Sequence, residues 1–155
     1  MTPLWRIAAA ADFSGEAAQF ADGRWHRAGL GVRLVYLAEH PALALVETLV
    51  HLDFAAEEWP STLRLVRVEA AAEVAIESIA ESALGAEWRE RQEATQAHGL
   101  RWLEAGRTAL LRVPAVPVPA AWNYLLNPRH AQASKIAVAW SKRLDFDRRL
   151  FRLRG

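Results

Sequence analysis

The sequence predicts an α+β fold, and the whole chain, residues 1–155, is expected to form one compact domain. Polar and apolar residues alternate with period two in STLRLVRVEA (61–70), which is typical of a strand. HPALALVETLVHL (40–52) predicts a helix, with Pro41 near its first turn. Because strands and helices follow one another irregularly, without a sustained strand–helix–strand rhythm, we expect a mixed, largely antiparallel sheet with flanking helices.

The N-terminal half continues this pattern. LWRIA (4–8) and RLVYLA (33–38) are expected to be strands. Between them, residues 12–31 are rich in glycine and charge and are expected to form a long, ordered loop. Helical stretches are expected within 86–105, ended by Gly106.

The C-terminal half is expected to supply the remaining strands. VPAVPVPAAW (113–122) predicts an extended edge segment, because proline cannot donate to a sheet ladder. NYLLNP (123–128) predicts a turn-rich segment. The strands expected here are TALLRVP (108–114), KIAVAWSKRL (135–144) and DFDRRLFRLR (145–154).

Composition excludes several classes of function. There are no cysteines, so disulfides and thiolate metal sites are excluded. A net charge of +1 argues against a broad nucleic-acid surface, so no direct binding of nucleic acid is expected. The N-terminus lacks the apolar run of a signal peptide, and no stretch is long and apolar enough to span a membrane. We therefore expect a cytoplasmic protein.

Common catalytic motifs are also missing. GLG (29–31) begins like a dinucleotide fingerprint, but Leu34 stands where the third glycine belongs. The chain has neither a GxxxxGK[ST] loop nor a GxSxG elbow. Glu47 and His51 share a helix face, but no third metal ligand is evident, so no metal is expected.

Three local features remain as candidates for a site. GRWHRAGLGVR (23–33) sets Arg24 and Trp25 among glycines, which suits a phosphate ligand or equally a solvated surface loop. Glu47 is the only acid of its apolar helix, and it could point into a cleft or belong to a solvated polar stripe. Asn123 and Asn127 could organise a pocket loop or form turns.

Taken together, these segments resemble the RES domain, a family named for arginine, glutamate and serine positions. The matching stretches occur in the family's order and cover most of the chain. They are WRI (5–7), GRW (23–25), VYLAEHPALALVETLVHL (35–52), TQAHGLRWL (95–103), LLRVP (110–114) and NYLLNPRH (123–130).

The resemblance implies a fold similar to that of ADP-ribosyltransferase toxins. It also implies a toxin of a toxin–antitoxin pair that degrades cellular NAD⁺, cleaving it as a glycohydrolase or phosphorylase. The implied partner is a cognate helix-turn-helix antitoxin that blocks the active site.

The family's site residues carry over position by position. The glycine-loop arginine falls on Arg24, the strand tyrosine on Tyr36, the helix glutamate on Glu47 and an early cleft arginine on Arg6. Glu47 would stabilise positive charge developing on the ribose, while Arg24 and Arg6 would bind the pyrophosphate. The flat nicotinamide cation would face Tyr36 or Trp25.

Two positions depart from the family's pattern. His26 stands where asparagine commonly follows GRW, and Ala115 stands where the family serine usually follows the VP of LLRVP. Thr108, at the start of the same strand, is the candidate for a replacement hydroxyl. Two alternatives to an NAD⁺-degrading enzyme therefore stay open. One is an ADP-ribosyltransferase acting on a macromolecule, and the other is a degenerate binding module without catalysis.

Overall fold

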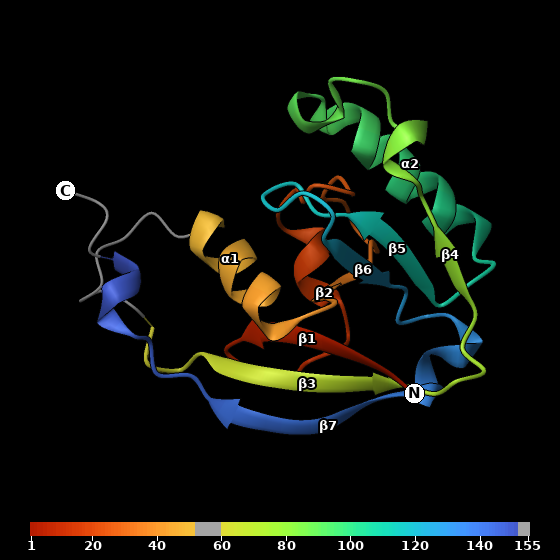
Figure 1. The fold of residues 1–155 in the computed structure, drawn as a ribbon. Coiled ribbons are helices and arrows are strands. Elements are labelled where there is room, and N and C mark those ends of the chain that lie inside the picture. The colour runs from red at the N-terminus through yellow and green to blue at the C-terminus, as the bar shows by residue number, and fades with distance from the viewer. Residues whose placement is uncertain (52–59, 152–155) are drawn as a thin grey trace.

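The structure is a computed structural model that describes residues 1–51 and 60–151. Its strands form a seven-stranded mixed sheet in the order β4-β5-β6-β2-β1-β3-β7 (Figure 1). The β4–β5 pair is parallel, and the other neighbouring pairs are antiparallel. The strands are β1 (Thr2–Ala8), β2 (Val35–Ala38), β3 (Arg64–Ala70), β4 (Ile76–Ser78), β5 (Leu110–Pro114), β6 (Trp122–Leu126) and β7 (Ile136–Arg143).

Two α-helices pack on this sheet, and both have clear terminal signals. Helix α1 (Pro41–His51) starts with proline, and the His40 ring accepts a hydrogen bond from Ala42 N–H at 3.1 Å. Helix α2 (Gln92–Ala105) ends at Gly106, whose φ of 59° is left-handed. Short 3₁₀ turns complete the fold: η1 (Glu16–Gln19), η3 (Glu81–Ala83), η4 (Trp88–Glu90), η5 (Ala131–Lys135) and η6 (Arg148–Phe151).

The sheet consists of two halves that meet at a narrow junction. Strands β1, β3 and β7 are paired along their lengths, as are β2, β6 and β5. The two sets are joined through one pair, Trp5↔Ala38, and Figure 1 shows them as separate layers. Buried side chains of both halves, such as Leu4 and Val66 from one and Leu37 and Leu126 from the other, belong to one core cluster.

The opposite face of β2, β6 and β5 carries both helices. Residues paired across these strands share a face, so Ala38 lies on the same face as Asn123 and Val113. Helix α1 covers this face through Leu43, which packs with Ala38. Helix α2 covers it farther along through Trp102, which is clustered with Val113. The two helices thus rest on different parts of one surface (Figure 1).

Most of the predicted elements are confirmed. The α+β class and the mixed, largely antiparallel sheet are as expected. Helix α1 lies within the expected 40–52, although residue 52 falls outside the described part, and Gly106 ends α2 as expected. The confirmed strand predictions are 4–8, 33–38, 61–70, 108–114 and 135–144.

Three predictions were wrong. NYLLNP (123–128) forms most of strand β6, in the middle of the sheet, because its apolar residues pack on both faces; the turn starts only at Asn127. The region 113–122 is no edge segment: after Pro114 the chain bends and turns to connect β5 with β6. Within 145–154, residues 145–147 are irregular and Arg148–Phe151 form η6 instead of a strand, and 152–154 lie outside the described residues.

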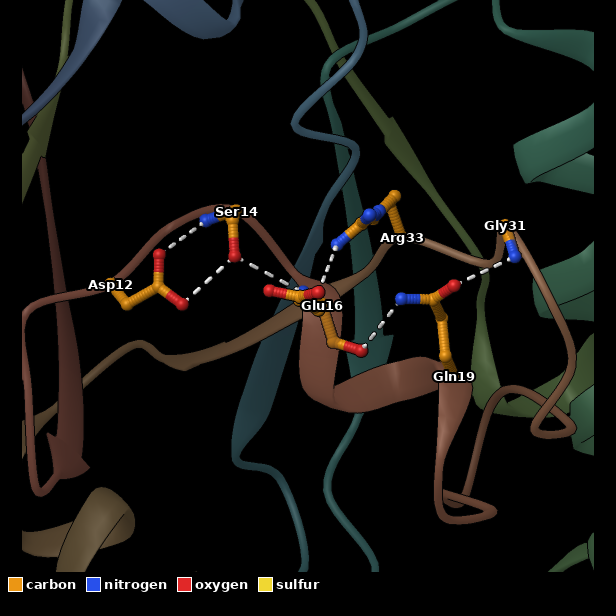
Figure 2. Close-up of polar contacts among 6 residues, drawn as sticks. All are labelled: Asp12, Ser14, Glu16, Gln19, Gly31 and Arg33. Atoms are coloured by element: carbon orange, nitrogen blue, oxygen red, sulfur yellow. Dashed lines mark hydrogen bonds and ion pairs between the residues drawn. The ribbon is translucent and has the colours of Figure 1, made fainter.

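The expected loop between β1 and β2 is ordered by its own side chains, as Figure 2 shows. Asp12 accepts hydrogen bonds from Ser14 N–H and Ser14 Oγ–H at 2.9 and 2.8 Å. Gln19, at the end of the 3₁₀ turn in the middle of the loop, accepts one from Gly31 N–H at 2.9 Å and so ties the middle of the loop to its C-terminal part. The loop also contains η1, which the sequence pattern did not indicate.

Candidate functional site

Glu47 and Asn123 meet above the β2–β6 part of the sheet. Asn123 Nδ2 donates a hydrogen bond to Glu47 Oε1 at 2.7 Å. Both side chains are partly buried, and Glu47 Oε2 has no hydrogen-bond partner among the described residues. The bond therefore fixes the carboxylate group while leaving one anionic oxygen available to a ligand.

Tyr36 lies on the same sheet face as Asn123, because Tyr36 pairs with Leu125 and Ala38 pairs with Asn123. Its hydroxyl accepts a hydrogen bond from Trp25 N–H at 3.1 Å and contacts His26 Nδ1 at 2.8 Å. Burial raises the pKa of the Tyr36 phenol, and the negative charge of Glu47 raises it further. Tyr36 is therefore a neutral aromatic residue, and its phenol is close enough to the Glu47 carboxylate for that charge to raise its pKa.

Arg24 is directed toward η4 and not toward Glu47. Its terminal nitrogen Nη2 donates to the carbonyl oxygen of Trp88, and its guanidinium carbon lies 5.6 Å from the centre of the Trp88 ring. Burial lowers the pKa of Arg24, and the charge of Glu90 partly offsets this. Arg24 Nε is buried without a hydrogen-bond partner among the described residues. A buried cationic donor without an acceptor suits an anionic ligand.

Trp25 is a core residue in this structure. Its side chain is 2% exposed and clusters with Trp88, Trp102 and Leu34. Of the two aromatic residues expected to face nicotinamide, only Tyr36 is partly exposed.

Arg6 sits at the junction between the two halves of the sheet, directly after Trp5. Strand alternation turns it to the face opposite Trp5, so it does not share a face with Tyr36 and Asn123. Burial lowers the pKa of Arg6, and the charge of Asp12 partly offsets this. Asp12 is therefore the acid whose charge acts on Arg6.

Asn127 has the contacts of a turn residue. Its side chain accepts a hydrogen bond from Arg129 N–H at 3.0 Å, and its own N–H donates to Ala109 O at 2.9 Å. These bonds end β6 and start the following turn. The two asparagines of this segment therefore differ, since Asn123 contacts Glu47 and Asn127 shapes the backbone.

Ala115 and Thr108 lie at opposite ends of β5. Ala115 follows the strand, is 1% exposed, and clusters with Leu43 and Ala44 of α1. Thr108 precedes the strand, and its Oγ1 accepts a hydrogen bond from Trp102 Nε1 at 2.9 Å. The Thr108 hydroxyl is thus held beside α2, away from the position of Ala115.

The structure brings Glu47, Asn123 and Tyr36 together and separates them from Arg6 and Asn127. The sequence pattern does not predict the partner of Tyr36, because His26 differs from its surroundings in sequence only by its departure from the family's pattern. His26 is 7% exposed. A histidine between Trp25 and Arg27, in a loop rich in glycine and charge, has no apolar periodicity that would predict such burial.

None of the helices within residues 1–51 and 60–151 is long and apolar enough to cross a membrane. Within the same residues, no three His, Cys, Asp or Glu side chains gather where they could hold a metal ion.

Comparison with known proteins gives consistent matches. The model of the RES domain family matches residues 3–149. A protein from Pseudomonas putida named Toxin Res is 43% identical over 152 residues, covering 96% of this chain and 99% of that protein. A protein from Sphingobium sp. named Prs ADP-ribosylating toxin is 37% identical, covering 97% and 98%. A Toxin Res from Yersinia enterocolitica is 32% identical, covering 78% of each chain.

Proposed function

This chain belongs to the RES domain family, and on that premise we propose that it is a toxin that consumes NAD⁺ by cleaving the bond between nicotinamide and ribose. The observation that carries the proposal is the Glu47 carboxylate, oriented by Asn123 with one oxygen available and placed near the ring of Tyr36. The names of the relatives support the toxin part of this proposal.

In the proposed reaction, the C1′–N bond breaks and its electron pair stays with the nitrogen, so that nicotinamide leaves as a neutral molecule. Positive charge then builds on the ribose, as in glycoside cleavage. An oxygen of water or inorganic phosphate forms the new bond to C1′, and the proton of water passes to solvent. The protein's task is to stabilise the developing cation and to hold the substrate in place.

The described residues divide these tasks. Glu47 would stabilise the ribosyl cation through its available oxygen, and Asn123 would keep the carboxylate aimed. The Tyr36 ring would face the nicotinamide cation. Arg24 would bind the pyrophosphate through its unsatisfied Nε–H, while Arg6 faces the other side of β1 and is given no part in this proposal.

A second candidate is transfer of ADP-ribose to a macromolecule by the same site. It is favoured by one specific observation, the name of the Sphingobium relative, Prs ADP-ribosylating toxin. The bond broken and the charge formed are the same in both reactions. The two candidates differ only in which nucleophile reaches C1′.

A toxin of this kind needs a restraining partner. We propose that a cognate antitoxin of the helix-turn-helix class covers the site, and that the protein acts on the NAD⁺ of the cytoplasm. Expression of the chain alone should then stop growth and deplete NAD⁺, while co-expression with the antitoxin should restore both. Normal growth and NAD⁺ levels, despite verified folded protein, would count against the toxin assignment.

The test of the activity uses purified protein and NAD⁺ labelled in its adenosine part. Release of free nicotinamide with all label in small molecules supports consumption by water or phosphate, and omitting phosphate separates those two acceptors. Label recovered on a macromolecule from a cell extract supports the second candidate. If neither product forms while the antitoxin still binds, the chain is a binding module and the proposal is wrong.

A further inference from the structure

His26 is a buried polar residue whose two ring nitrogens both have partners. Nδ1 lies 2.8 Å from the Tyr36 hydroxyl, and Nε2 lies 2.9 Å from Ala21 O and 3.2 Å from Ala18 O. The ring is 7% exposed, so water cannot easily replace these contacts. A histidine in this position connects the main chain around η1 with Tyr36.

The chemistry of the partners determines the direction of each hydrogen bond. Carbonyl oxygens only accept, so Nε2 must carry the proton that points to Ala18 and Ala21. In a neutral imidazole, Nδ1 is then an acceptor, and the Tyr36 hydroxyl donates to it. The same hydroxyl accepts from Trp25 N–H at 3.1 Å, so it is bound as both donor and acceptor.

We infer that His26 is a positioning residue, which holds Tyr36 by its hydroxyl so that the ring keeps its orientation near Glu47. This inference rests on the proposed function, because it assigns Tyr36 a role toward the substrate. An asparagine at this position would offer an acceptor oxygen close to where His26 presents Nδ1.

Helix α2 holds the segment that carries His26. Thr95 Oγ1 donates to Arg24 O at 2.6 Å, and Gln96 Nε2 donates to Gly23 O at 3.0 Å. Gly99 is required at the same contact, because a Cβ there would overlap the main chain of Trp25. The TQAHG stretch of α2 is therefore a clamp on the 23–26 segment.

Gly23 completes the arrangement from the other side. A Cβ at this position would overlap both the Tyr36 hydroxyl and the His26 ring. Its N–H also donates to His26 O at 3.0 Å, which closes the segment on itself. The contact between His26 and Tyr36 thus depends on a glycine and on a helix that is distant in sequence.

Two substitutions separate positioning from ordinary core stability. His26→Asn keeps an acceptor near Nδ1 and loses the donor that reaches Ala18 and Ala21. His26→Gln keeps a donor near Nε2 and loses the acceptor for Tyr36. Positioning of Tyr36 predicts that His26→Asn stays within about threefold of the parent in kcat/KM, while His26→Gln falls about tenfold, the loss of roughly one buried hydrogen bond.

A purely structural role predicts the opposite order, because His26→Gln keeps the bonds to the main chain. Melting temperatures measured on both variants give the structural effect separately. A double-mutant cycle with Tyr36→Phe adds a second check. Because Tyr36→Phe removes the hydroxyl that contacts His26, adding His26→Gln to it should lower kcat/KM little further. Activity in the order Gln above Asn, or independent multiplying effects with Tyr36→Phe, would overturn the inference.

The contact itself can be tested without any turnover. Nitrogen-15 NMR of the parent protein should show His26 protonated at Nε2 and unprotonated at Nδ1 at neutral pH. A proton on Nδ1 would remove the proposed acceptor and overturn the inference, whatever the protein does to NAD⁺. Absence of NAD⁺ turnover in the parent, with the Nε2–H tautomer present, would count against the proposed function and against the catalytic purpose of the contact.

Discussion

Glu47 of α1 and Asn123 of β6, 76 positions apart in the sequence, are joined by a hydrogen bond of 2.7 Å. The acceptor is a carboxylate, so the bond belongs to the stronger, charge-assisted class. It connects the helix that covers the sheet with a strand in the middle of the sheet. Substitutions of these two residues, and of the other residues assigned to the site, test the proposed function.

Glu47→Gln should keep the fold and abolish NAD⁺ loss. Glutamine keeps the size of the side chain and an oxygen for Asn123, but it lacks the negative charge that stabilises the ribosyl cation. Removing one such group costs on the order of 10²–10³ in rate. Nicotinamide release under matched protein concentrations measures the effect, with the exposed Glu104→Gln as control. Parent-like turnover in Glu47→Gln would show that the catalytic assignment is wrong.

Asn123→Ala and Asn127→Ala should fail in different ways. Asn123→Ala removes the bond that aims Glu47, so kcat should fall by about ten- to a hundredfold, as expected for a hydrogen bond to a charged group. Asn127→Ala removes a turn contact and should lower the free energy of unfolding by about 0.5–1.5 kcal/mol. Equal losses of kcat in both variants would indicate that Asn127 also contributes to the proposed site.

Arg24→Lys should raise KM for NAD⁺ by about tenfold with a smaller change in kcat. A lysine cannot reproduce a planar fork, and it also loses the hydrogen bond from Nη2 to the carbonyl oxygen of Trp88. Saturation kinetics separate the two constants. Arg91→Lys, an exposed arginine paired with Glu93, is the matched control. An unchanged KM in Arg24→Lys would leave Arg24 with a structural role at η4.

Both tyrosines of the chain should resist ionisation in the folded protein. Burial raises the pKa of Tyr36 and of Tyr124 above the ordinary value of 10.0. Above pH 10, the unfolded chain therefore binds fewer protons than the folded chain, and the free energy of unfolding falls as pH rises. Phenolate absorbance should develop near pH 10 in denatured protein and at higher pH in folded protein. A tyrosine that ionises near pH 10 in the folded protein would contradict this prediction.

Ala115→Ser should raise turnover by about two- to tenfold, because a neutral hydrogen bond contributes about 0.5–1.5 kcal/mol. The position packs against α1, the helix of Glu47. Thr108→Val should lower stability through the lost contact with Trp102 and leave turnover unchanged. A loss of turnover in Thr108→Val, with no gain in Ala115→Ser, would favour Thr108 as the substitute hydroxyl.

Elements whose signals are local could be predicted from the amino-acid sequence. Alternation in STLRLVRVEA, Pro41 at the start of α1 and Gly106 at the end of α2 all act within a few residues of their own position. Motifs in order along the chain also determined the family, and with it Glu47 and Tyr36 as candidates. None of these signals requires knowledge of what lies across the sheet.

Which candidate residues lie in contact depends on the three-dimensional packing and could not be predicted from the sequence. Asn123 and Asn127 look alike in sequence, but sheet register turns one toward Glu47 while a turn uses the other. NYLLNP reads as turns, yet its apolar residues become a central strand because they are buried on both faces. His26 has no local signal at all, because its burial and its contact with Tyr36 arise from α2, a helix far along the chain, clamping the loop that carries it.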